Sequence, residues 1–191
     1  MVNDLQYTKD KNENTIYYLR VSKENTSEDI NLNGVKREKT DNAKRKLPLT
    51  DIFINDLKFL EFVKQRKKEK HNFIFVNEQK DLDIEENIKN TVRRCEEFFN
   101  SRLKKLKIED LDKKSFYSLR HSFANKIKHI PETLKDKRGE TLMGHSGATD
   151  SELFNRYGNK YFEPDFLYEI LEKVEYSDMD LNFEKIQKVI K

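Results

Sequence analysis

The sequence predicts an α+β protein that is mainly helical, with a small antiparallel sheet at its N-terminal end packed on a helical bundle. Before residue 50, β-branched and aromatic residues come in short runs separated by polar turns, a pattern typical of strands. After residue 50, apolar residues recur every three or four positions in several segments, a pattern typical of amphipathic helices. The length suits one domain, and thirteen Phe and eight Tyr supply bulky core material.

The N-terminal segment reads as a set of short strands. We expect the first at Asp4 to Tyr7 and the second at Thr15 to Val21, which is rich in β-branched and aromatic residues. After a polar loop, two further strands are expected to form a hairpin, at Val35 to Thr40 and at Lys44 to Leu49. Pro48 should end the last strand, because proline cannot donate to a strand ladder.

Helices follow, each with an apolar stripe. Thr50 or Asp51 should cap the first of them. Its stripe consists of Phe53, Leu57, Leu60 and Val63. The expected helical segments are Thr50 to Lys70, Ile84 to Leu106, the helix that carries Arg120, Pro131 to Gly144, and a helix that starts at Pro164.

Shorter segments join these helices and end the chain. The apolar run Phe73 to Val76 is either a strand or a buried connector. Asp150 or Ser151 should cap a short helix that presents Tyr157. We divide the chain into a main domain over residues 1–176 and a C-terminal tail helix over residues 177–191. The tail helix is too short to be stable alone, so it should dock either on its own domain or on a neighbouring protomer.

Composition excludes several classes of function. Cys95 is the only cysteine, so one chain can form neither a disulfide framework nor a thiolate metal site, which fits a reducing compartment. The sequence contains neither a signal peptide nor a long apolar run, and we expect a cytoplasmic protein with no membrane partner. Glycine is scarce and the four His lack metal-ligand spacing, so we expect chemistry without a metal or a nucleotide cofactor.

The net charge of +3 favours nucleic acid only weakly, but basic residues cluster in three runs. For any single run, the solvated face of a helix is the simpler explanation. The alternative is that the runs line a groove that follows the phosphates of a nucleic acid, and this interpretation needs independent support from a motif. The runs are Lys36 to Lys46, Lys64 to Lys70, and Arg102 to Lys107.

The stretch from Phe116 to Tyr157 carries the candidate chemistry. At helical spacing, one apolar arc should face a core, and Arg120 lies on its flank. A guanidinium keeps its charge there and needs an anionic partner. A histidine, His145, follows a glycine at a helix end, and a tyrosine, Tyr157, precedes another glycine. The residues of the arc are Phe116, Leu119, Phe123 and Ile127.

Three motifs in this stretch resemble those of one family. Ser118 to Phe123 (Ser-Leu-Arg-His-Ser-Phe) is similar to the second arginine box of tyrosine recombinases, the phage integrase family. Leu142 to Ser146 is similar to the family's Leu-Gly-His-Ser box, and Arg156 to Gly158 to its nucleophile box. Each motif alone is weak, but the order and spacing of the three indicate the family. The resemblance covers nearly the whole chain and implies the integrase catalytic-domain fold without its first helix.

The resemblance implies DNA cleavage and rejoining on duplex DNA, as in site-specific recombination or integration. Tyr157 would attack the scissile phosphate and form a 3′-phosphotyrosyl link. Arg120 and His145 would bind the phosphate, and Lys39 would protonate the leaving 5′-oxygen. Lys39 matches the family's hairpin lysine, although the hairpin lysines could instead be exposed edge residues that prevent aggregation. The resemblance implies no cofactor, and it implies a possible homo-oligomer on DNA through the tail.

Two departures from the family pattern leave an alternative open. Tyr117 stands where the family usually has His; its phenol can hydrogen-bond a phosphate but is no base near neutral pH. The family's first arginine has no match, since Arg20 lies in an expected strand, so we expect a shortened catalytic domain or the product of a truncated gene. The alternative is a DNA-binding relic that keeps the fold without the chemistry, and a basic helical domain with chance motifs is a third reading.

Overall fold

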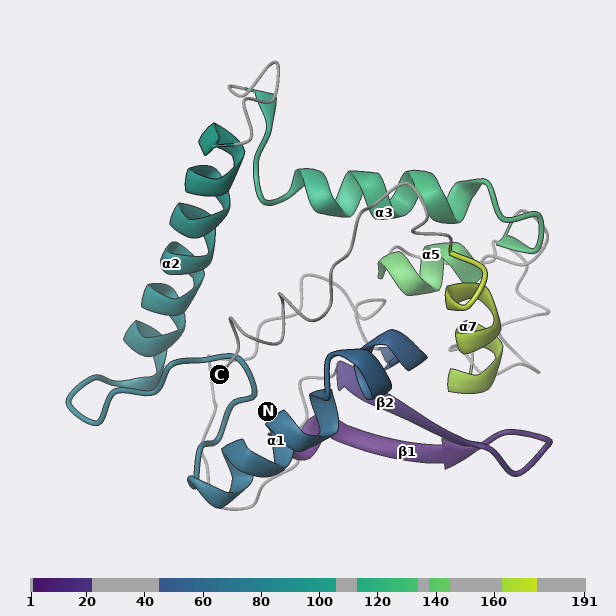
Figure 1. The fold of residues 1–191 in the computed structure, drawn as a ribbon, viewed down its shortest axis with the longest axis horizontal. Coiled ribbons are helices and arrows are strands. Elements are labelled where there is room, and N and C mark those ends of the chain that lie inside the picture. Colours follow the sequence, from purple (N-terminus) through teal and green to yellow (C-terminus); the bar gives the residue numbers. More distant parts are fainter. Residues whose placement is uncertain (1, 22–44, 106–112, 134–137, 145–162, 175–191) are drawn as a thin grey trace, which may run out of the picture.

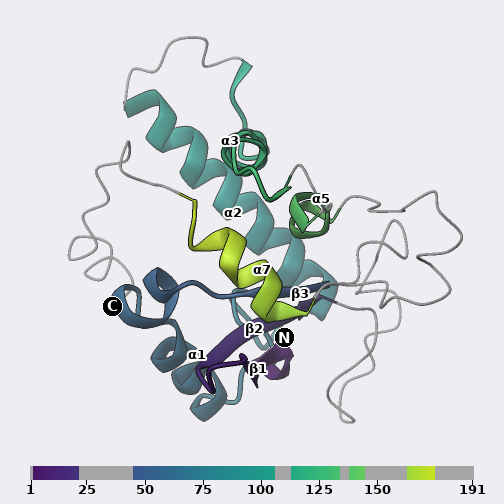
Figure 2. The same ribbon diagram turned by 90° about the vertical axis from the view of Figure 1, so that its right-hand side faces the viewer.

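The protein has an α+β fold in which a small antiparallel sheet lies beside several helices (Figure 1). The computed structural model describes residues 2–21, 45–105, 113–133, 138–144 and 163–174. In both ribbon views α5 and α7 lie between α3 and the sheet (Figures 1 and 2), and Figure 1 shows α2 on the opposite side of the molecule from α7. The elements named here are α2 (Ile84–Lys105), α3 (Ser118–Lys128), α5 (Arg138–Met143) and α7 (Pro164–Leu171).

Within the described residues, the sheet has three antiparallel strands in the order β1-β2-β3. The second strand is confirmed with its predicted bounds, whereas the first starts one residue later and runs further than expected. Pro48 ends the third strand, as predicted. The expected partner strand at Val35 to Thr40 lies outside the described residues. The strands are β1 (Leu5–Lys9), β2 (Thr15–Val21) and β3 (Arg45–Pro48).

The single helix predicted over Thr50 to Lys70 is wrong, because the chain breaks it in two. A π-helical turn, η3 (Ile52–Asp56), comes first, and the backbone of Lys58 then turns left-handed, with φ of 52°. The second piece is α1 (Phe59–Lys68). The break shifts the helical phase: Val63 is buried as predicted, but Phe59, outside the predicted stripe, is buried with it, whereas Phe53 is 43% exposed.

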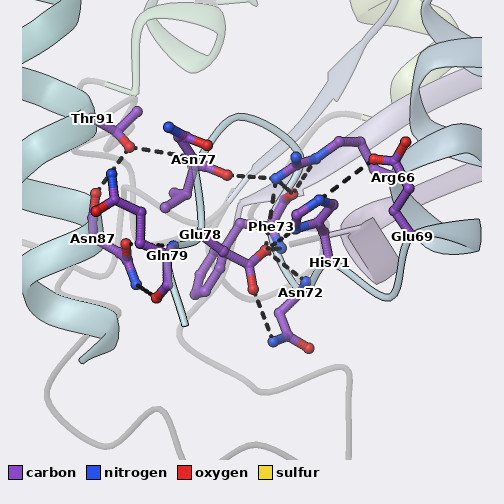
Figure 3. Close-up of polar contacts among 11 residues, drawn as sticks. Arg66, Glu69, His71, Asn72, Phe73, Asn77, Glu78, Gln79, Asn87 and Thr91 are labelled. Atoms are coloured by element: carbon purple, nitrogen blue, oxygen red, sulfur yellow. Dashed lines mark hydrogen bonds and ion pairs between the residues drawn. The ribbon is translucent and has the colours of Figure 1, made fainter. Parts of the chain in front are cut away.

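The run Phe73 to Val76 is a connector held by a polar network (Figure 3). Arg66 of α1 donates hydrogen bonds to the carbonyl oxygens of Phe73 (3.1 Å from Nη2) and Val76. The Glu78 carboxylate accepts from the backbone N–H groups of Asn72 (2.8 Å) and Phe73 (3.0 Å). Side chains therefore satisfy backbone groups that a sheet partner would otherwise satisfy.

The same network anchors the start of α2 (Figure 3). Asn87 is only 5% exposed. Its amide accepts from the N–H of Gln79 and donates to the carbonyl oxygens of Gln79 and Leu82, so the buried polar group is satisfied. The helix matches its predicted start, and residue 106 lies outside the described part. Two of its large apolar side chains do not face the core, since Val92 and Phe98 are more than half exposed.

One core cluster joins the C-terminal half of α3 to α5, α7 and β3. It contains Ile127 and Met143, and the side chains of Leu167 and Ile170 are fully buried within it. The predicted arc of α3 is thus only half right: Phe123 and Ile127 pack into this cluster, whereas Phe116 and Leu119 are about half exposed. The Phe116 ring instead meets Phe99 of α2 edge-on, with centroids 5.6 Å apart.

Polar contacts fix α7 against the first half of the chain. The Tyr168 hydroxyl donates to Asp51 Oδ1 (3.0 Å), and Lys46 of β3 pairs with Glu163 (2.7 Å) just before α7. Burial and then the hydrogen bond to Asp51 raise the pKa of Tyr168 above its ordinary value. As predicted, Pro164 begins α7. The helix therefore ties the N-terminal sheet to the motif-bearing half.

Among the helices of the described part of the chain, none combines the length and apolar character that crossing a membrane requires. The predicted tail helix over residues 177–191 lies outside the described residues, as does the boundary at residue 176.

Candidate functional site

Arg120 reaches from the first half of α3 to the end of α5. Its Nη2 atom donates a hydrogen bond to the carbonyl oxygen of Met143, the last residue of α5. The carbonyl groups at a helix C-terminus lack intrahelical partners and carry partial negative charge, which favours a cation there. This contact brings the motif around Arg120 directly beside the Leu-Met-Gly-His motif.

Gly144 ends α5 in a left-handed conformation, with φ of +67°, and its N–H donates to the Thr141 carbonyl oxygen (3.0 Å). The helical segment thus stops at the residue where the sequence predicted its end. Arg45 of β3 packs its guanidinium against this glycine. A Cβ built on Gly144 would lie 2.4 Å from Nη1 of Arg45, so only glycine leaves room for this approach.

Two guanidinium groups therefore meet at the end of α5, one from α3 and one from β3. Burial, and second the charge of Arg120, lower the pKa of Arg45 below its ordinary value. The guanidinium stays protonated near neutral pH, because arginine titrates far above that range. Two positively charged side chains thus lie next to each other at the end of α5.

Tyr117 and His121 flank Arg120 at the start of α3. The Tyr117 and His121 rings pack edge to face with centroids 5.1 Å apart. The guanidinium carbon of Arg120 lies 5.9 Å from the centroid of the Tyr117 ring, within the range of a cation–π contact. Tyr117 remains 59% exposed, so its phenol is accessible from solvent beside the arginine.

The structure places two of the five predicted site residues. Tyr117 and Arg120 lie together, and the Arg120 guanidinium ends one residue before Gly144, the direct neighbour of His145 in the chain. Lys39, His145 and Tyr157 lie outside the described residues. Their geometry is therefore not part of the site described here.

Sequence reasoning missed Arg45 as a site residue. It is the first residue of the Arg-Lys-Leu-Pro-Leu run at the end of the expected hairpin, where the sequence predicts only Lys39 as a site residue. The available signal was its place at the start of β3. A strand pattern cannot reveal which helix end that strand meets, and this contact depends on the tertiary fold.

Arg66, in the basic run Lys64 to Lys70, has a structural role. Its guanidinium is turned inward onto the connector carbonyls and lies 3.7 Å from Glu78 (Figure 3). His71 lies between Glu69 (3.4 Å) and Glu78 (3.5 Å). Within the described ranges, no cluster of three or more His, Cys, Asp or Glu side chains is placed to hold a metal ion.

Comparisons of the chain with models of protein families, with curated proteins and with solved structures find no match. Function is therefore inferred from the residues and their geometry.

Proposed function

We propose that this chain is the catalytic domain of a tyrosine recombinase, which cleaves and rejoins duplex DNA through a 3′-phosphotyrosyl intermediate. The observation that supports this most strongly is the contact between Arg120 and Met143. It joins two motifs that are separate in the sequence but would have to bind one phosphate together.

Arg120 and His145 act on the scissile phosphate in this proposal. The planar guanidinium of Arg120 neutralises a non-bridging oxygen with paired N–H donors, a geometry that suits phosphate. His145 follows Gly144 in the chain and donates to the same phosphate. Both groups stabilise the charge that builds up on the phosphate oxygens during attack.

In this proposal Tyr157 is the nucleophile and Lys39 is the general acid. The phenol oxygen of Tyr157 forms a bond to phosphorus as its proton passes to water, and the bond from phosphorus to the 5′-oxygen breaks. Lys39 protonates that oxygen, which leaves as a 5′-hydroxyl. A phenol with a pKa of about 10 is a weak nucleophile, so the reaction depends on the cationic groups around the phosphate. The new phosphodiester keeps the energy of the old one, and rejoining needs no ATP.

Tyr117 contributes a hydrogen-bond donor next to Arg120. Its exposed hydroxyl can donate to a phosphate oxygen, and the ring contact with the arginine limits the positions that the guanidinium takes up. It does not serve as a base near neutral pH. General acid–base work therefore falls to Lys39.

Double-stranded DNA is the partner, bound largely through its phosphates, with a homo-oligomer formed on DNA through the C-terminal tail. Such a protein works where DNA is directly accessible, in the cytoplasm of a cell that carries a phage or another mobile element. No cofactor is needed for the chemistry.

The second candidate is a DNA-binding relic without catalysis, and Tyr117 in place of histidine is the feature that favours it. A pool of nicked suicide duplexes of random sequence separates the two. A recombinase leaves DNA attached to protein after denaturation in detergent. A relic gives salt-sensitive binding without attachment. A chain with chance motifs gives neither, even at low salt.

A further inference from the structure

The two guanidinium groups at the end of α5 come from different parts of the fold. Arg120 lies on α3 and contacts Met143, while Arg45 lies at the start of β3 and contacts Gly144. These contacted residues are neighbours in the chain, so the two cations converge on a single turn. Two like charges repel each other, so placing them together has an energetic cost. Neither the packing of the helices nor the pairing of the strands requires it.

The packing fixes this convergence. Met143 is buried in the core cluster, β3 is paired to β2, and Leu47 of β3 packs against the same cluster. Arg45 therefore extends from a strand that is held both by its pairing with β2 and by its packing against the core cluster. Gly144 leaves it the necessary space, because a Cβ there would lie 2.8 Å from the guanidinium carbon. A pre-set pair of guanidinium groups matches a tetrahedral oxyanion, which offers several oxygens at once.

We propose that Arg45 is the second phosphate-binding arginine of this site and contacts the scissile phosphate together with Arg120. The proposal rests on the proposed function, for which the family resemblance implies two arginines at the phosphate. Only Arg120 lies in a matching motif. Arg45 would supply the second positive charge from the strand β3.

A purely structural role for Arg45 is the competing explanation. In that case its guanidinium only supports the turn at Gly144, and the substitution Arg45→Gln lowers stability without changing anion affinity. The two roles predict different anion binding, so the test measures phosphate affinity separately from stability.

The experiment uses the full chain and inorganic phosphate as the probe. Phosphate affinity is measured by titration and by the rise in melting temperature relative to chloride at equal ionic strength. We expect Arg45→Gln and Arg120→Gln each to weaken phosphate binding about tenfold or more, the order expected for one charged contact. The matched control is Arg93→Gln on α2, whose arginine pairs with Glu97 (3.6 Å), and it should bind phosphate like the wild type.

Arg45→Lys is the second variant, in case Arg45→Gln does not fold. It keeps the charge but loses the planar fork and reach, and we expect phosphate binding about threefold weaker. Unchanged phosphate affinity in whichever of the two variants folds would overturn the role of Arg45.

Formation of the covalent DNA adduct separates this proposal from the proposed function. If phosphate binding depends on both arginines but the wild type forms no adduct, the anion site stands and the recombinase function fails. If the wild type forms adduct and Arg45→Gln matches it in rate and in phosphate affinity, the function stands and the role of Arg45 fails.

Discussion

Arg120 donates a hydrogen bond to the carbonyl oxygen of Met143, and this contact links α3 to the end of α5 across the candidate site. The contact has a consequence for substitutions of the arginine. A lysine keeps the charge but cannot reproduce the planar fork, whereas a glutamine loses the charge as well.

Arg120→Gln should reduce the rate of adduct formation about 100- to 1,000-fold, the usual effect of losing one transition-state donor. Arg120→Lys should lose less, because it keeps a cation near the phosphate. The rates are measured with nicked suicide duplexes at saturating protein. Arg93→Gln serves as the control, and a rate for Arg120→Gln equal to that of this control would contradict the assigned role.

Gly144→Ala should destabilise the chain by about 1 to 2 kcal/mol, because alanine is strained at a positive φ. The new Cβ also displaces the Arg45 guanidinium. In an Arg45→Gln background the shorter side chain removes that clash, so the cost should be smaller. Urea unfolding of the four variants in this cycle gives the coupling energy. A cost that is the same in both backgrounds would show that the two residues do not interact.

Gly139→Ala should also destabilise the chain, although alanine favours a helix interior by about 1 kcal/mol. A Cβ on Gly139 would lie 2.8 Å from Cγ2 of the buried Ile127 and 3.2 Å from Thr133, and overpacking of this kind costs about 1 to 3 kcal/mol. The same change in an Ile127→Ala background should cost less, since the closest atom is gone. Stabilisation of the wild type by Gly139→Ala would mean that α3 and α5 are not packed this closely.

Tyr168→Phe should cost about 0.5 to 1 kcal/mol at neutral pH, because the hydrogen bond to Asp51 is lost. The pKa of Tyr168 is raised in the folded state, so its stabilising effect is complete below the unfolded value of 10.0 and is lost as pH rises above it. The difference between wild type and Tyr168→Phe should therefore shrink above pH 10. Urea unfolding at several pH values measures this trend.

The control for that series is Tyr7→Phe, whose tyrosine is mostly exposed on β1. It is unfolded in urea at the same pH values, so that the two series can be compared directly. A difference between wild type and Tyr168→Phe that stays constant above pH 10 would mean that the hydroxyl is not held as the contact with Asp51 indicates.

The sequence predicted best the features that depend on local pattern. Thr15 to Val21 is a strand with the predicted bounds, since its aromatic and β-branched residues favour an extended chain. Pro164 starts α7, where its missing N–H costs nothing. The position of Gly144 marked the end of α5 for the same kind of local reason.

Features that depend on tertiary contacts could not be predicted in this way. The left-handed backbone at Lys58 breaks a periodic apolar pattern that reads as one helix, so that Phe59 is buried beside the expected Val63 while Phe53 is left exposed. Arg66 lies in a basic run yet turns inward onto backbone carbonyls. Arg45 reaches the candidate site only because β3 passes the end of α5, a relation between distant segments of the chain.

The central claim is that Tyr157 attacks DNA, and mapping of the covalent link tests it most directly. Wild type, Tyr157→Phe and the matched control Tyr161→Phe are incubated with nicked suicide duplexes, denatured in detergent and digested for mass spectrometry. We expect wild type and Tyr161→Phe to carry a nucleotide on the peptide that contains Tyr157, and Tyr157→Phe to carry none. Attachment at another residue, or adduct of equal yield from Tyr157→Phe, would contradict the claim. Absence of adduct from all three proteins, with DNA binding intact, would identify a binding protein without this chemistry.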